Sequence, residues 1–584
     1  MLLRKPVFMG TYARFFCLIF MQIKGMSIYR HSFLSKEGSV FLRRLFLCVL
    51  TVLLVFTGCA QTPPPSPETP SGPDVPDLQQ SHTTQRLQAY TVSSPAGRNL
   101  EIETATFDLG SEPLPAATRA VQYRLRGVVS APKDDGKYPI VLLLHGSHEN
   151  MEDNKRFDTG FTYLCEALAQ NGYIAVAVDI APAFLWKYGE NDLEKTIAIA
   201  NRHIALLQSA NDGNDSGYGV SLSGRMDFDN LYLLGLSRGG GATFEIAAEQ
   251  MSLGQNISGI LAIAPATVSL RTSFPDIPSS ILVPTYDGDV TDWQGYHLYY
   301  LIRNNNLSSP VTLTLLEGAN HNYFNSNLTI NDAEFLPFPR DNQISREEQQ
   351  QFLIDYTLDA ITGVCALSNL GSQAPRTAFN QHITTATHSA GNRSLIDVAD
   401  LSGFADASAA LTHLVDSWFF QMDTAHYFDS ITYGAVGDPL QTKDLIQIVW
   451  QNAQEYVDIS PNVADWHEDK SLILQVAQAP ADERNVPGVY QSFSVRLTDK
   501  SGNTSTLSLP KEEGALRYVS GEKAEYTVTT PPYRTWSRQT PLMDIRIPLS
   551  SFEGVDLSDI AAVSLVFDQT DAGCIMLSGA WVSQ

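Results

Sequence analysis

One short stretch restricts the fold of this chain more than any other: the Gly-Leu-Ser-Arg-Gly sequence at residues 235–239. The residues before it, 229–234, are apolar and β-prone, and the residues after it, 241–250, have the composition of a helix. A serine between a strand and a helix sits on a tight, strained turn, and the flanking glycines let the two elements approach each other. The pattern predicts that Ser237 presents its hydroxyl at the end of a buried strand, where it can act as a nucleophile.

Three further apolar runs lead into residues that can support such a nucleophile. Residues 140–144 run into a His-Gly pair, residues 281–286 run into several aspartates, and residues 311–316 are followed by glycine and then His321. Strand patterns over 173–179, 230–234 and 258–264, and helical patterns over 158–170, 192–209 and 346–362, alternate with these runs. Near-continuous apolar strands that alternate with helices predict a parallel sheet covered on both faces.

The chain order Ser, Asp, His is that of the α/β-hydrolase fold, and residues 139 to about 354 resemble this superfamily. The His-Gly-x-His sequence at 145–148 and the Asp-Gly-Asp-Val-x-Asp-x-Gln-Gly sequence at 287–295 are similar to an esterase and lipase-like group of secreted bacterial hydrolases. The resemblance implies an α/β hydrolase: a mostly parallel, doubly covered sheet with an edge strand near 123–130 that pairs antiparallel.

The expected catalytic triad is Ser237, His321 and an aspartate. His321 follows a strand, where it can act as the base for the serine. Asp289 is the favoured acid, because it lies three residues beyond the expected strand end at 286, the Gly-x-x-Asp spacing usual in the family. Asp287 is the second choice and Asp292 the third, since one of these aspartates could cap the following helix or turn.

Two backbone amides should stabilise the oxyanion. The fold implies that one is the amide of Arg238 and that the other comes from the loop after the His-Gly pair. Ser147 is the expected second donor, with His148 as the alternative. His145 is interpreted as a structural loop histidine.

These residues predict a serine hydrolase that cleaves small-molecule or polymeric carboxylic esters through an acyl-enzyme. No metal or organic cofactor is implied. Two alternatives stay open: a peptidase of the prolyl-oligopeptidase kind, and a surface glycan-binding lipoprotein with an inactive hydrolase domain. The absence of propeller repeats disfavours the first alternative, and the complete Ser, Asp and His set disfavours the second.

The N-terminus resembles a bacterial lipoprotein signal. Arg43 and Arg44 precede an apolar run over 45–56, and Thr-Gly then leads to Cys59. The resemblance implies cleavage before Cys59 and lipid on its sulfur, which would anchor the protein to a membrane of the bacterial envelope, outside the cytoplasm. A plain membrane anchor or a cleaved secretory signal are the alternatives. The Pro- and Ser-rich residues 59–83 should form an extended tether.

Composition excludes some partners. The formal net charge is −24 at pH 7, which argues against binding to nucleic acid. Of the six cysteines, Cys165, Cys365 and Cys574 follow Cys59; they are odd in number and far apart, so no disulfide framework or metal site is expected.

Beyond about residue 370, helical periodicity gives way to short β-rich runs separated by Gly, Asn and Asp turns, such as Lys-Ser-Gly-Asn at 500–503. The pattern predicts an all-β sandwich. Residues 493–503 and 547–560 resemble galactose-binding-like jelly rolls, which implies a possible glycan ligand. We therefore expect a signal over 1–58, a linker over 59–83, a hydrolase domain over 84–368 and a β-sandwich over 369–584.

Overall fold

The computed structural model describes most of the chain beyond residue 98. The described residues are 99–362, 383–416, 443–518, 523–526, 533–536 and 541–583, except for gaps at 149–150, 152–153, 190, 267–273, 292, 304, 306, 337–339, 462–465 and 480–481. The predicted signal, the linker, Cys59 and Asp292 lie outside these residues, so the predictions for them stay predictions.

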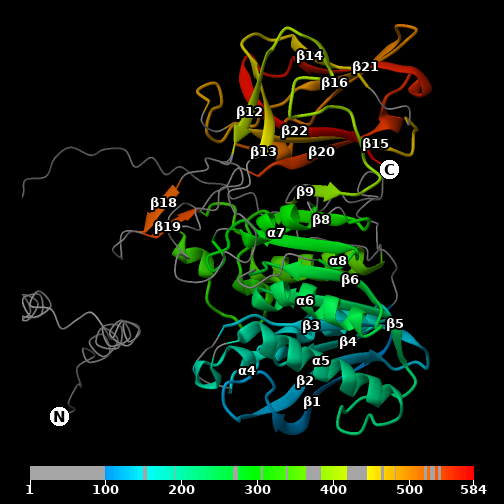
Figure 1. Cartoon of the computed structure of the whole chain (residues 1–584), viewed down its shortest axis with the longest axis vertical. Helices are drawn as coiled ribbons and strands as arrows, with labels where there is room; N and C mark the ends of the chain where they lie inside the picture. Colours follow the sequence, from blue (N-terminus) through cyan, green and yellow to red (C-terminus); the bar gives the residue numbers. More distant parts are fainter. Residues whose placement is uncertain are drawn as a thin grey trace, which may run out of the picture. The chain divides into compact units, whose positions relative to one another are not determined.

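A mixed sheet forms the first part of the described chain (Figure 1). In their spatial order, its strands are β1 (Ile102–Pro113), β2 (Gln122–Pro132), β4 (Ile174–Val178), β3 (Tyr138–Leu144), β5 (Met226–Leu236), β6 (Ile257–Ile263), β7 (Ser279–Pro284), β8 (Val311–Leu316) and β9 (Ile383–His388). Strands β3 to β8 pair in parallel, whereas β1, β2 and β9 pair antiparallel at the two edges. Strand β2 contains the antiparallel segment expected near 123–130, but β1, rather than β2, forms the edge of the sheet.

Helices cover both faces of this sheet (Figure 1). The helices and 3-10 turns are η1 (Asp158–Phe161), α3 (Thr162–Gln170), α4 (Ala181–Phe184), η2 (Trp186–Tyr188), α5 (Asp192–Asn211), α6 (Arg238–Ser252), α7 (Gln294–Arg303), η3 (Asn322–Phe324), η4 (Asp332–Phe335) and α8 (Arg346–Thr362).

The alternation of side chains along β3 shows how the two faces are filled. Ile140 and Leu142 belong to an apolar cluster that includes α5, α6 and α7, whereas Val141 and Leu143 belong to a second cluster with α3 and α8. Successive side chains of a strand point to opposite faces, so a strand that is apolar at every position can be buried on both. This is why the near-continuous apolar runs of the sequence form the centre of the sheet.

Antiparallel sheets make up the C-terminal part. One has the order β12 (Ala410–Asp416), β13 (Lys443–Trp450), β22 (Gly573–Val582), β15 (Ser471–Gln478) and β20 (Met543–Pro548), with β10 (Arg393–Ser394) paired to β22. Another has the order β11 (Phe404–Ala407), β14 (Glu455–Ile459), β21 (Ile560–Phe567), β16 (Ser494–Asp499) and β17 (Thr504–Ser508). A short pair, β18 (Lys523–Tyr526) and β19 (Tyr533–Trp536), and the turns η7 (Gly514–Leu516), η8 (Leu549–Ser551) and η9 (Leu557–Asp559) complete this part.

The two larger antiparallel sheets touch through aromatic side chains. Trp450 of β13 stacks on Phe567 of β21, with ring centroids 4.3 Å apart, and Phe493 packs against the edge of Phe567. These contacts fit the expected β-sandwich, but the jelly-roll arrangement and a glycan site stay predictions.

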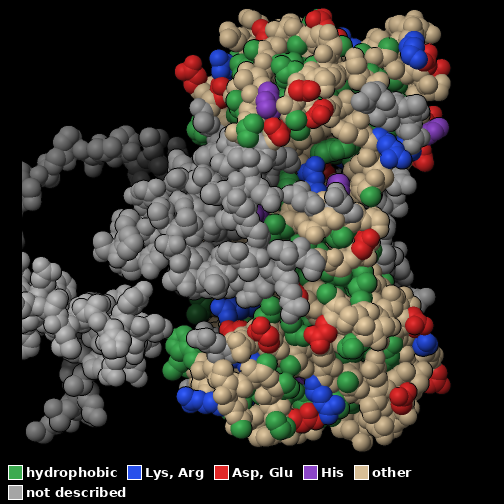
Figure 2. Space-filling view, viewed as in Figure 1, with side chains coloured by type: hydrophobic (Ala, Val, Ile, Leu, Met, Phe, Trp, Pro, Cys, Tyr) green, Lys and Arg blue, Asp and Glu red, His purple; other side chains and the backbone are tan. Residues whose placement is uncertain are grey.

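The sheet of the first part continues beyond the expected domain boundary. Strand β9 lies in the region assigned to the second domain, yet it pairs with β8 along its whole length. Within the described residues, no helix is long and apolar enough to cross a membrane. The face drawn in Figure 2 shows acidic and basic side chains interspersed, without a continuous basic patch among the residues described there.

Candidate active site

Ser237 occupies a strained turn between β5 and α6. Its backbone angles are φ 58° and ψ −126°, a conformation that residues other than glycine rarely adopt. A Cβ on Gly235 would come 2.4 Å from the carbonyl group of Gly239, and a Cβ on Gly239 would come 2.4 Å from the carbonyl oxygen of His145. Glycine is therefore required at both positions for strand, helix and neighbouring loop to meet, as the sequence pattern predicts.

His321 and Asp287 form a buried hydrogen-bonded pair. His321 lies five residues after the end of β8 and Asp287 three residues after the end of β7. His321 Nδ1 is 2.9 Å from Asp287 Oδ2, and the side chains are 0% and 2% exposed. His321 Nε2 is buried without a hydrogen-bond partner among the described residues. An imidazole held at Nδ1 by a carboxylate, with its other nitrogen not engaged in a hydrogen bond, has the arrangement of a general base.

The structure gives Asp287, rather than the favoured Asp289, the position against Nδ1. Strand β7 ends at Pro284, two residues earlier than the sequence suggested, so the residue three places beyond the strand is Asp287. Asp289 lies on the other side of the ring, with Oδ2 3.5 Å from His321 Nε2, and its side chain is 56% exposed. The backbone amide of Asp289 instead donates to Asp287 Oδ1 at 3.0 Å, which helps to fix that carboxylate.

The loop after β3 approaches the serine. A Cβ on Gly146 would lie 2.6 Å from Ser237 Cβ and 2.8 Å from His148 Nε2. The Gly146 amide donates to His148 Nε2 at 3.2 Å, and the His148 ring lies 6.3 Å from the His321 ring. Gly146 and His148 thus lie between Ser237 and His321. The Gly146 amide already donates a hydrogen bond to His148. The oxyanion assignments to Ser147 and Arg238 stay predictions.

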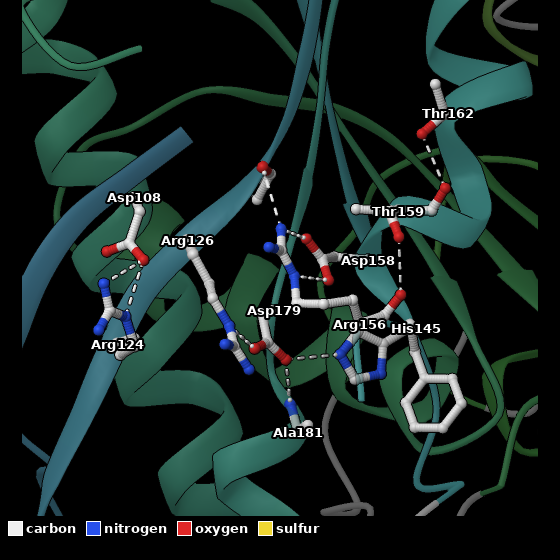
Figure 3. A network of polar contacts seen from close by, with 12 residues as sticks. Asp108, Arg124, Arg126, His145, Arg156, Asp158, Thr159, Thr162, Asp179 and Ala181 are labelled. Carbon is white, nitrogen blue, oxygen red and sulfur yellow. Dashed lines mark hydrogen bonds and ion pairs between the residues drawn. The ribbon is translucent and has the colours of Figure 1, made fainter. Parts of the chain in front are cut away.

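A buried polar network supports the start of this loop (Figure 3). His145 Nε2 lies 3.0 Å from the amide nitrogen of Ile180, and Nδ1 donates to the Gly146 carbonyl at 2.7 Å. Asp179 lies 3.3 Å from His145 Nε2 and 2.6 Å from Arg126 Nε. Burial raises the pKa of Asp179, but His145 and Arg126 outweigh burial and lower it overall. These bonds are those of a structural histidine.

Several carboxylates surround His321. Burial by itself lowers the pKa of the imidazole, but the charge and hydrogen bond of Asp287, followed by the charges of Asp289 and Asp332, together raise it to about 10. By contrast, burial lowers the pKa of His148 well below its usual value, and the neighbouring His321 and His145 lower it further. His148 is therefore neutral and His321 is the histidine that can hold a proton. Sequence reasoning missed Asp332, which no motif marks.

Comparison with known proteins supports a hydrolase. Residues 107–281 match the family model described as Chlorophyllase, a family of the α/β-hydrolase type. The match covers less than half of the chain; it includes Ser237 and ends before Asp287 and His321. The comparison with curated proteins found no match. The chain therefore contains an α/β-hydrolase-type segment with a β-rich C-terminal part.

Proposed function

We propose that this protein is a serine hydrolase that cleaves carboxylic esters, with Ser237 as nucleophile, His321 as general base and Asp287 as the triad acid. The observation that carries the proposal is the buried His321–Asp287 pair, in which His321 Nε2 makes no hydrogen bond to the described residues, together with a serine on a strained strand-to-helix turn. The family match over 107–281 supports the same class of reaction.

The proposed reaction is acyl transfer to water. His321 Nε2 removes the proton of the Ser237 hydroxyl as its oxygen attacks the ester carbonyl, and the oxyanion forms near the amides of Arg238 and Ser147. The imidazolium, stabilised by Asp287, then protonates the departing alcohol and leaves an acyl group on Ser237. Water, deprotonated by His321, attacks this acyl group and releases the acid.

Exposed apolar side chains support a substrate with an apolar part. Three apolar side chains in segments that follow parallel strands are largely exposed: Met151 after β3 (62%), Trp186 after β4 (60%) and Ile330 after β8 (62%). Ligands of open α/β sheets bind at the carboxyl ends of the parallel strands, and the segments that hold these side chains follow such ends. We propose an ester whose acyl or alcohol part is apolar, bound at this edge.

Hydrolysis of p-nitrophenyl esters of increasing chain length by the full chain tests the proposal. We expect turnover that is lost in Ser237→Ala, and covalent labelling by a fluorophosphonate only in the wild type. Medium-chain esters should be preferred over acetate if the apolar side chains bind substrate. The absence of both turnover and labelling in the wild type would refute a serine hydrolase, whereas labelling without turnover would exclude only these esters.

A further inference from the structure

A second buried carboxylate beside the triad has no role in the reaction as proposed. Asp332 begins η4, eleven residues after His321, and is 2% exposed. Such a group loses its hydration on burial and needs hydrogen bonds to offset that cost. Its partners therefore indicate what it does.

Three backbone amides, from the two catalytic loops, donate hydrogen bonds to the Asp332 carboxylate. Its Oδ2 accepts the amides of Gly288 at 2.8 Å and His321 at 3.0 Å, and its Oδ1 accepts the amide of Asn322 at 2.9 Å. Gly288 directly follows Asp287. One carboxylate thus joins the loop of the acid, which follows β7, to the loop of the base, which follows β8.

The fit between Asp332 and the acid loop is close. A Cβ on Gly288 would lie 2.0 Å from the backbone oxygen of Asp332, so a side chain there would push the two segments apart. The base loop is also bonded to Gln349 of α8. The amide of Asn320 donates to Gln349 Oε1 at 3.0 Å, and Gln349 Nε2 donates to the Asn320 carbonyl at 2.7 Å. The base loop is therefore held from α8 before His321 and from Asp332 at and after it.

We propose that Asp332 is a positioning residue, which fixes the backbones of the acid and base loops so that Asp287 meets His321 Nδ1. The inference rests on the proposed triad and extends it to a residue that does not touch the reacting atoms. The arrangement has an electrostatic cost: burial and the charge of Asp287 raise the pKa of Asp332, while His321 and the backbone amides lower it in part. Within the part of the chain that the structure describes, the titratable groups that act on His321 are Asp287, Asp289, Asp332 and His148.

The Asp332→Asn variant of the full chain tests this role. An amide has one acceptor oxygen, and its NH₂ group would face backbone donors, so at least one of the three bonds is lost. We expect kcat per active site, titrated with fluorophosphonate, to fall by about ten- to a hundredfold with little change in KM. Loss of the negative charge should also move the acidic limb of the kcat/KM profile to lower pH, because Asp332 helps to raise the pKa of His321.

Asp355→Asn is the matched control. Asp355 is also a buried carboxylate, 6% exposed on α8, where it accepts from Gln351 at 3.1 Å. Both variants should lose some thermal stability, but only Asp332→Asn should change kcat and the pH profile. Wild-type kcat and an unshifted limb in Asp332→Asn would overturn the inference, even with a lower Tm, because a purely structural role predicts that result.

Gly288→Ala keeps the proposal testable if Asp332→Asn does not fold. The added methyl group should separate the loops while the carboxylate remains, so we expect the same fall in kcat with a smaller shift of the acidic limb. Unchanged kcat in Gly288→Ala would contradict the inference. A wild-type protein that neither reacts with fluorophosphonate nor hydrolyses esters would instead refute the proposed function, and the inference with it.

Discussion

At the scale of single residues, the charges around His321 determine the pH at which the site works. The imidazole must be neutral to accept the serine proton, and its pKa is raised to about 10, mainly by Asp287 against the opposing effect of burial. Below that pKa the base is protonated, so kcat/KM should fall as pH decreases from the alkaline range. A base with a high pKa is a strong proton acceptor, so the enzyme should be most active in alkaline solution.

Comparing Asp287→Asn with Asp289→Asn separates the two acids. An asparagine at 287 should donate to Nδ1 and favour the wrong imidazole tautomer, lowering kcat by about 10³- to 10⁴-fold, as in other triads. Asp289→Asn should retain most of kcat and move the acidic limb to lower pH, because one charge that raises the pKa of His321 is removed. The measurement is the pH profile of kcat/KM for each variant. A larger loss of kcat in Asp289→Asn would return the role to Asp289.

Sequence reasoning placed Ser237 and His321 in the candidate triad, but the aspartate that it favoured is not the one that meets His321 Nδ1. Ser237 and His321 follow motifs that are short and local, so their positions could be predicted. The choice between Asp287 and Asp289 depended on where β7 ends, and strand ends are set by tertiary packing that a local pattern does not contain. Asp332 could not be found at all, because its three partners come from two loops that only the folded sheet brings together.

At the scale of elements, the loop after β3 depends on an ion pair beneath it. Asp179 is fully buried and Arg126 is 14% exposed, so removal of the carboxylate leaves a poorly solvated cation. The same carboxylate accepts the amide of Ala181, at the start of α4, at 3.0 Å. One side chain therefore joins β2, the end of β4 and the loop after β3 (Figure 3).

Asp179→Asn should reduce the free energy of unfolding by about 3 kcal/mol and lower kcat by displacing the loop. Asp108→Asn is the control on the adjacent strand, because its partner Arg124 is 57% exposed and such pairs contribute about 0–1 kcal/mol. Since the pKa of Asp179 is lowered in the fold, its contribution is present at neutral pH and lost on acidification. Urea unfolding at neutral and acidic pH measures both effects. Equal losses in the two variants at neutral pH would contradict this account.

At the scale of the whole molecule, the described residues belong to one compact unit. Tyr296 of α7 accepts the amide of Leu542 at 2.9 Å, and Arg303 of the same helix donates to Gln475 of β15 at 2.9 Å. Asp544 of β20 accepts the amide of Thr387 at 2.7 Å. These hydrogen bonds join the β-rich part to the hydrolase part, and the expected domain boundary stays a prediction.

A chain that ends at residue 388 tests this dependence. It keeps β9 but loses the partners of Tyr296, Arg303 and Thr387, and it exposes to water the apolar side chains of α7 that share a core with the β-rich part, at a cost of about 25 cal/mol per Å² of apolar surface. We expect a lower Tm and a larger insoluble fraction than for the full chain, measured by thermal unfolding and by fractionation after expression. A soluble, fully active product with an unchanged Tm would show that the β-rich part is a detachable module.

The position of β9 has a consequence for how the protein is made. Until residues 383–388 leave the ribosome, β8 pairs only with β7, and the backbone donors and acceptors along its other edge are free. The buried polar groups of α7 must wait still longer, for Gln475 and Leu542. During synthesis, the strand that precedes His321 is thus open to pairing with other chains, and the nascent protein should depend on chaperones until its last third has emerged.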